Sequence, residues 1–133
     1  MRVIYEPQGR AAEYAPLALN LRNTCSHGCK YCYCPSSPPV KFLFDDPEEF
    51  RQAGPLRKGF SLDKLEADLR DLAEAGDERP VHMCFVGDPF DRGCDNDIMH
   101  DVLRLFAKAG VRPQILTKAG WLGETYLESL VEA

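Results

Sequence analysis

Long apolar runs are absent from this chain of 133 residues. No stretch approaches the ~20 apolar residues that a membrane-spanning helix needs, and residues 1–7 contain no apolar segment of the kind that directs export. Internal repeats and low-complexity tracts are also absent. We therefore expect one domain, or a piece of one, without membrane contact and located in the cytoplasm.

A strongly basic surface is missing as well. Residues 1–58 contain eight Lys/Arg and six Asp/Glu, a net charge of +2, whereas residues 59–133 contain eight and fifteen, a net charge of −7. Phosphate backbones bind basic surfaces. The charge therefore does not support nucleic acid as a partner of the second half, although the first half could accept an anionic partner.

Cysteine, in contrast, is plentiful for this length. Of the six cysteines, two lie apart and four form a cluster: Cys84 and Cys94, and then Cys25, Cys29, Cys32 and Cys34. A secreted disulfide scaffold is the alternative for a small chain of this kind, but it requires an export signal. In a reducing compartment, clustered cysteines more often bind metal or carry out redox chemistry.

The cluster begins with a C-x3-C-x2-C motif made of Cys25, Cys29 and Cys32. Three thiolates this close in the sequence can hold three corners of a cubane iron–sulfur cluster, because thiolate is the usual protein ligand for such clusters. The fourth iron would keep an open position, which is what distinguishes a catalytic metal site from a closed structural one. This motif predicts a cluster that can bind a small molecule.

Two alternatives depend on Cys34. It could complete a four-cysteine zinc site, with or without His27, in a non-catalytic interaction module, or it could close the cluster of an electron-transfer protein. Cys32 and Cys34 flank a single residue, so they would point in opposite directions on an extended chain. We therefore interpret Cys34 as an incidental thiol.

Apolar periodicity predicts alternating strands and helices. Strands are expected at 16–22, 81–86 and 114–117, and helices at 61–75, from Asp95 or Asp97 to Gly110, and at 121–131, with a helical turn at 47–52. The first long helix should be capped by Ser61, stop at Gly76 and bury Leu62, Leu65, Leu69 and Leu72; the second should bury Ile98, Val102, Leu105 and Phe106. This order indicates a parallel α/β sheet.

Three chemically suggestive segments each follow a predicted strand: the cysteine motif, Gly87-Asp88-Pro89 and Thr117-Lys118. Ligands of parallel sheets bind at the carboxyl ends of the strands, so we expect these segments to meet. The Asp88 carboxylate and nearby carbonyls could bind an ammonium group, and Lys118 could contact an anionic group. The plain readings are a turn and a solvated lysine. We interpret His82 as a packed histidine and Cys84 as a buried small residue.

The cysteine motif after a first strand, with Tyr31 just before Cys32, resembles the radical S-adenosylmethionine superfamily. That resemblance implies a 4Fe–4S cluster held by Cys25, Cys29 and Cys32. The open iron would chelate S-adenosylmethionine, whose reductive cleavage yields a 5′-deoxyadenosyl radical. It also implies an electron donor such as a flavodoxin or ferredoxin. The glycine-and-acid motif of the family matches Gly87 and Asp88, although the usual acid is glutamate.

A narrower resemblance is to the branch of spore photoproduct lyase-like and DNA repair photolyase-like proteins. It rests on the segments 9–11, 13–20 leading into Cys25-Ser26-His27-Gly28-Cys29, 87–90 and 116–118. The resemblance implies that Tyr31, Gly87, Asp88 and Lys118 bind S-adenosylmethionine. It leaves the substrate unknown, with nucleic acid as an option that the charge does not favour.

The family core is a partial TIM-type barrel of about six strand–helix units, and this chain supplies about three. We therefore expect the amino-terminal half of such a (β/α)6 barrel, with residues 1–15 as an extension and residues 16–133 as a core that is incomplete at its carboxyl end. The open edge of the sheet would be covered by the missing half or by another chain.

Overall fold

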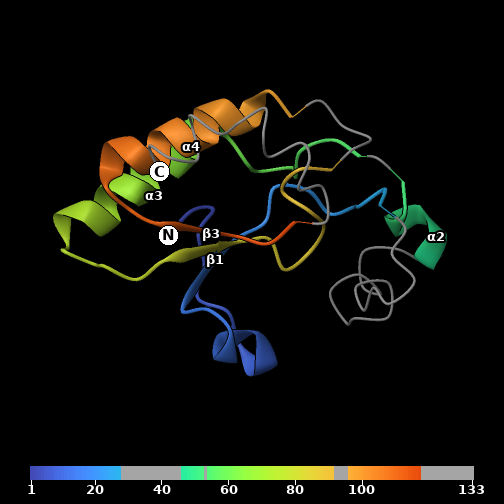
Figure 1. The fold of residues 1–133 in the computed structure, drawn as a ribbon, viewed down its shortest axis with the longest axis horizontal. Helices are drawn as coiled ribbons and strands as arrows, with labels where there is room; N and C mark the ends of the chain where they lie inside the picture. Colours follow the sequence, from blue (N-terminus) through green and yellow to red (C-terminus); the bar gives the residue numbers. More distant parts are fainter. Residues whose placement is uncertain (28–45, 53, 92–95, 118–133) are drawn as a thin grey trace.

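The computed structural model describes residues 1–27, 46–52, 54–91 and 96–117. They form an α/β fold around a parallel sheet of three strands in the order β1-β2-β3 (Figure 1). The strands are β1 (Leu17–Leu19), β2 (Val81–Met83) and β3 (Pro113–Ile115). The predicted parallel α/β architecture is confirmed at this level.

Both connections between the strands pass through helices that lie side by side on the sheet. The helices α3 (Leu62–Glu74) and α4 (Ile98–Ala109) pack against each other (Figure 1). All three residues of β1 are fully buried, which is typical of a parallel strand that is covered on both faces. A short helix, α2 (Pro47–Phe50), confirms the expected helical turn.

The first long helix agrees closely with its prediction. Ser61 caps α3, because its hydroxyl accepts a hydrogen bond of 3.1 Å from the Lys64 N–H. Beyond the helix, Gly76 has a φ of +68°, a left-handed conformation that glycine adopts without strain. The leucines at helical spacing enter the core, with Leu62 only partly buried and Leu65, Leu69 and Leu72 buried.

The second helix differs from its prediction in detail. The fully buried side chains of α4 are Met99, Val102, Leu103 and Phe106, whereas Ile98 and Leu105 are only partly buried. The buried face of α4 is therefore rotated slightly from the predicted face, because apolar residues lie on both sides of it. Asp97 occupies the N-cap position without a capping hydrogen bond from its side chain, and Gly110 ends the helix at a φ of +73°.

All three strands are shorter than expected. After Met83 the chain leaves the sheet, and the N–H groups of Phe85 and Val86 donate to the Asn20 side-chain oxygen at 2.9 and 3.0 Å. Asn20 directly follows β1, so one buried side chain replaces the ladder hydrogen bonds that a longer β2 would have made. It also joins the carboxyl ends of β1 and β2.

The amino-terminal segment is tied to the helical side of the sheet. The Asp68 carboxylate in α3 accepts hydrogen bonds from the backbone N–H groups of Arg2, Val3 and Ile4 at 2.7–2.9 Å. Tyr5 then pairs with Ala18 along the outer edge of β1, and a 3-10 helix, η1 (Gly9–Glu13), follows. Among the described residues, no helix is long and apolar enough to cross a membrane.

Candidate functional site

Two loops meet where β1 and β2 end. The chain after β1 leads to the start of the cysteine motif at Cys25, and the chain after β2 leads to the turn of Gly87 and Asp88. The His27 Nδ1 atom lies 3.4 Å from the Asp88 Oδ2 atom, and both side chains are almost fully buried. The expected meeting of these two segments is confirmed as far as the described residues extend.

Asp88 organises its own turn and reaches the end of β3. Its Oδ1 atom accepts hydrogen bonds from the Phe90 N–H at 2.8 Å and from the Thr117 hydroxyl at 2.6 Å. The first contact is an Asx turn, and the second has the length of a charge-assisted O–H···O bond. With only 8% of its surface exposed, Asp88 connects the loops that follow all three strands.

A second carboxylate holds the same segment. The Asp91 side chain is fully buried, and its two oxygens accept hydrogen bonds from Ser26, one from the backbone N–H at 3.0 Å and one from the hydroxyl. Asn96 donates to the Asp91 carbonyl oxygen at 2.7 Å. We call Asp88 and Asp91, together with Ser26 and His27, the site clamp. It fixes the two residues that follow Cys25.

The residues before Cys25 are held by backbone contacts. Gly87 has a φ of +78°, and a Cβ atom placed there would lie 2.7 Å from the Thr24 carbonyl oxygen. A Cβ atom on Gly54 would also collide with the Thr24 side chain. The Cys25 N–H donates to the Phe50 carbonyl oxygen at 2.8 Å. Gly54 and Gly87 both approach Thr24 too closely for a larger residue at either position.

The ligand set itself is described only in part. Cys25 is partly exposed. Cys29, Tyr31, Cys32, Cys34, Cys94 and Lys118 lie outside the described residues, so their predicted roles stay predictions. In the part of the chain that is described, no three His, Cys, Asp or Glu side chains gather as a metal site.

Cys84 differs chemically from Cys25. Burial raises the pKa of the Cys84 thiol to about 12, so it stays protonated at neutral pH and is not a ready metal ligand. The interpretation of Cys84 as a buried small residue is confirmed. His82 is also packed, with its ring 4.4 Å from that of Phe85, and burial lowers its pKa.

Sequence reasoning missed four residues of this site: Ser26, His27, Asp91 and Thr117. His27 was considered only as a zinc ligand, and Thr117 only as part of the resemblance. The signal for Asp91 was weak: it is an acidic residue directly after the apolar Pro89 and Phe90, and such a residue needs a partner when it is buried. The identity of that partner could not be read from the sequence.

Searches against protein-family models, curated proteins and solved structures found no match to this chain. The candidate site is therefore interpreted from its own residues.

Proposed function

We propose that this chain is a radical S-adenosylmethionine protein, or part of one, that binds a 4Fe–4S cluster through Cys25, Cys29 and Cys32. The cysteine spacing is what suggests this ligand set, because three thiolates leave one iron open. When bound, the cluster supplies the electron that cleaves S-adenosylmethionine to methionine and a 5′-deoxyadenosyl radical. The chain's own residues bind and orient these groups and exclude competing reactions.

The observation that carries the proposal is the contact between the cysteine segment and the glycine-and-acid turn. His27 and Asp88 are separated by 61 positions in sequence, yet their side chains lie 3.4 Å apart. A cofactor on the open iron would need polar acceptors for its ammonium group close to the cysteines. The contact brings the turn of Gly87 and Asp88 beside the residues that follow Cys25, which supports a binding role for this turn.

Each residue has a distinct task in this proposal. Asp88 accepts a hydrogen bond from the cofactor's ammonium group and holds the turn through Thr117 and the Phe90 N–H. Gly87 lets the turn approach the Thr24 carbonyl. Tyr31 and Lys118 contact other parts of the cofactor, as the resemblance implies.

The fold supports the proposal in its coarse form. A three-stranded parallel sheet with helices α3 and α4 on it is what the first half of a partial (β/α)6 barrel would contain. Within the described residues, β3 pairs with β2 alone, and Leu116 beyond it is 64% exposed. We propose that further strands, from this chain or another, continue the sheet beyond β3.

Anaerobic reconstitution followed by iron, sulfide and zinc analysis tests the proposal. We expect about four irons per chain, and a shift of the reduced cluster's electron paramagnetic resonance signal when S-adenosylmethionine is added. Changing Cys25, Cys29 or Cys32 to alanine should abolish iron binding. Cys34→Ala should retain it, and Cys84→Ala is a matched control for loss of a thiol outside the motif.

Two results would replace the proposal with its alternatives. Stoichiometric zinc without sulfide would indicate an interaction module. A cluster that is lost in Cys34→Ala and shows no response to S-adenosylmethionine would indicate a closed electron-transfer centre.

A further inference from the structure

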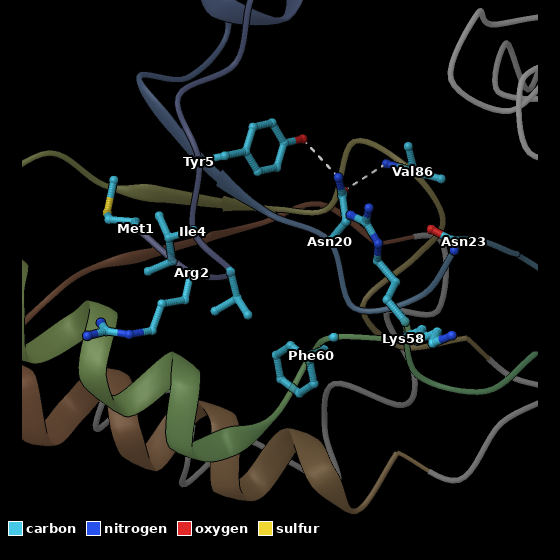
Figure 2. Close-up of a pocket in the computed structure, with 12 residues that line it drawn as sticks. Met1, Arg2, Ile4, Tyr5, Asn20, Asn23, Lys58, Phe60 and Val86 are labelled. Carbon is cyan, nitrogen blue, oxygen red and sulfur yellow. Dashed lines mark hydrogen bonds between the residues drawn. The ribbon is translucent and has the colours of Figure 1, made fainter.

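A groove lies beside the carboxyl end of β1, apart from the site clamp. It has a volume of about 510 Å³, which is within the usual range for small-molecule sites. Figure 2 shows Tyr5 and Asn20 on one side of it, and Phe60 and Lys58 on the opposite side. The amino-terminal segment and the loop before α3 therefore build its walls together.

The charged side chains of this groove are all cationic. Arg2, Arg57 and Lys58 line it, and none of its lining residues, all of which the structure describes, is acidic. Arg2 is engaged by Asp68 and Asp71. Neither Arg57 nor Lys58 has an ion pair or side-chain hydrogen bond with the described residues, so two positive charges remain for a ligand in a chain whose net charge is −5.

Tyr5 adds a neutral donor whose direction is set by its neighbour. The Asn20 oxygen already accepts from the N–H groups of Phe85 and Val86, so its amide nitrogen must donate, and it does so to the Tyr5 hydroxyl oxygen at 2.8 Å. The Tyr5 proton is therefore directed elsewhere, and it meets no acceptor among the described residues. Burial raises the pKa of Tyr5, so this proton is retained at neutral pH.

We propose that this groove binds the terminal phosphate of an organic phosphate monoester, held by Tyr5, Arg57 and Lys58. A phosphate monoester carries close to two negative charges at neutral pH, which match the two cations, and its three terminal oxygens can each accept from a different donor. Asn23 stands at the rim as a further polar group.

The organic part of the ligand has its own surface. Ile4 is buried, and Val3, Phe60 and Val86 are partly buried where they line the groove. An apolar wall beside a cationic one fits an ester with a flat or apolar body better than it fits inorganic phosphate. The inference does not depend on iron or on the cysteines.

Calorimetric titration of the full chain with adenosine 5′-monophosphate, adenosine and inorganic phosphate tests the proposal. We expect the monophosphate to bind most tightly and adenosine not to bind. A short oligonucleotide, tested with and without a 5′-phosphate, distinguishes two sources of the phosphate group. Binding that requires the 5′-phosphate would identify the end of a nucleic acid as the ligand. Binding of adenosine 5′-monophosphate without binding of either oligonucleotide would identify a free metabolite.

Two sets of variants distinguish specific binding in the groove from attraction of the phosphate to positive charge anywhere on the protein. Tyr5→Phe keeps the ring and removes only the hydroxyl, and it should weaken binding roughly tenfold or more. Arg57→Ala with Lys58→Ala should weaken it by roughly a hundredfold. Arg70→Ala with Lys108→Ala removes the same charge from exposed positions on α3 and α4 and should leave binding unchanged.

The proposal is overturned if adenosine binds as well as its monophosphate, or if Tyr5→Phe and the Arg57/Lys58 double variant retain the parent affinity. It is also overturned if the Arg70/Lys108 control loses as much affinity as the groove variants, because binding would then follow net charge alone. Thermal melts of each variant show whether the fold is retained. The Tyr5 backbone pairing with Ala18 involves no side chain, so Tyr5→Phe keeps it and loses only the hydrogen bond from Asn20. We therefore expect Tyr5→Phe to fold, with a modestly lower melting temperature than the parent protein.

Discussion

Buried carboxylates hold the chain together in two regions of this molecule, and the groups that they bind differ between the two regions. In the amino-terminal clamp, which we define as Asp68 with residues 2–4, the carboxylate accepts from three backbone N–H groups. In the site clamp, Asp88 and Asp91 bind the side chains of His27, Thr117 and Ser26 as well as backbone groups. Both clamps join segments more than 60 positions apart.

The two clamps differ in which amino-acid substitutions they can tolerate. Backbone N–H groups are present in almost any residue, so the amino-terminal clamp depends mainly on Asp68, with one additional contact from the Arg2 side chain, and serves the fold. The site clamp depends on particular side chains at both ends, and two of its partners, Ser26 and His27, directly follow Cys25. Substitutions that weaken the first clamp should lower stability, whereas those that weaken the second should act mainly on what the cysteine segment binds.

The largest effect should come from Asp68→Ala. It leaves three N–H groups without their acceptor, and we expect a loss of about 3 kcal/mol in the free energy of unfolding. Chemical denaturation of the metal-free protein measures it. Asp71→Ala, which removes only an exposed ion pair with Arg2, is the matched control and should cost far less. Equal losses in the two variants would show that Asp68 has no special role.

The corresponding test of the site clamp is Asp88→Ala. We expect weaker binding of S-adenosylmethionine by about tenfold or more, since a hydrogen bond to a charged group contributes about 1.5–3 kcal/mol. Asp88→Asn should do less harm, because its oxygen can still accept from Thr117 and the Phe90 N–H. Titration of the cofactor-induced shift in the paramagnetic resonance signal measures both. If Asp88→Ala bound S-adenosylmethionine with unchanged affinity, the turn of Gly87 and Asp88 would have only a structural role.

Acid should weaken the amino-terminal clamp in a predictable direction. Burial alone would raise the pKa of Asp68, but the N–H groups of residues 2–4 and the Arg2 side chain outweigh it, so the pKa lies below its usual value. The stabilisation is therefore fully present above the unfolded-state pKa of about 3.9 and is lost as the pH falls through the lower folded-state value. The stability advantage of the parent over Asp68→Asn should shrink below about pH 4 in denaturation series.

The smallest effect on stability should be that of Ser26→Ala. The backbone N–H of residue 26 keeps its hydrogen bond to Asp91, and only the hydroxyl bond is lost, so we expect a loss of about 1 kcal/mol. Loss of iron to a chelator should nevertheless become faster, because the segment after Cys25 is held less firmly. Unchanged iron release would limit the role of this hydroxyl to folding.

Local structure was largely readable from the sequence. The cap at Ser61, the leucine spacing of α3 and the glycine stop at Gly76 each depend on residues close in the sequence, so each can be read from its own segment. The parallel sheet followed from the alternation of such elements. The strand ends did not, because Asn20 replaces the ladder bonds of β2 from a different part of the chain.

The order of the elements, the cysteine spacing and a glycine-and-acid turn at the carboxyl edge of the sheet can all be read from the sequence. The contacts of Asp91 with Ser26, those of Asp88 with His27 and Thr117, and the groove shared by Tyr5 and Arg57 arise only on folding. They arise because a buried polar group must find a partner. Which partner it finds depends on the residues that folding brings beside it, not on those next to it in the chain.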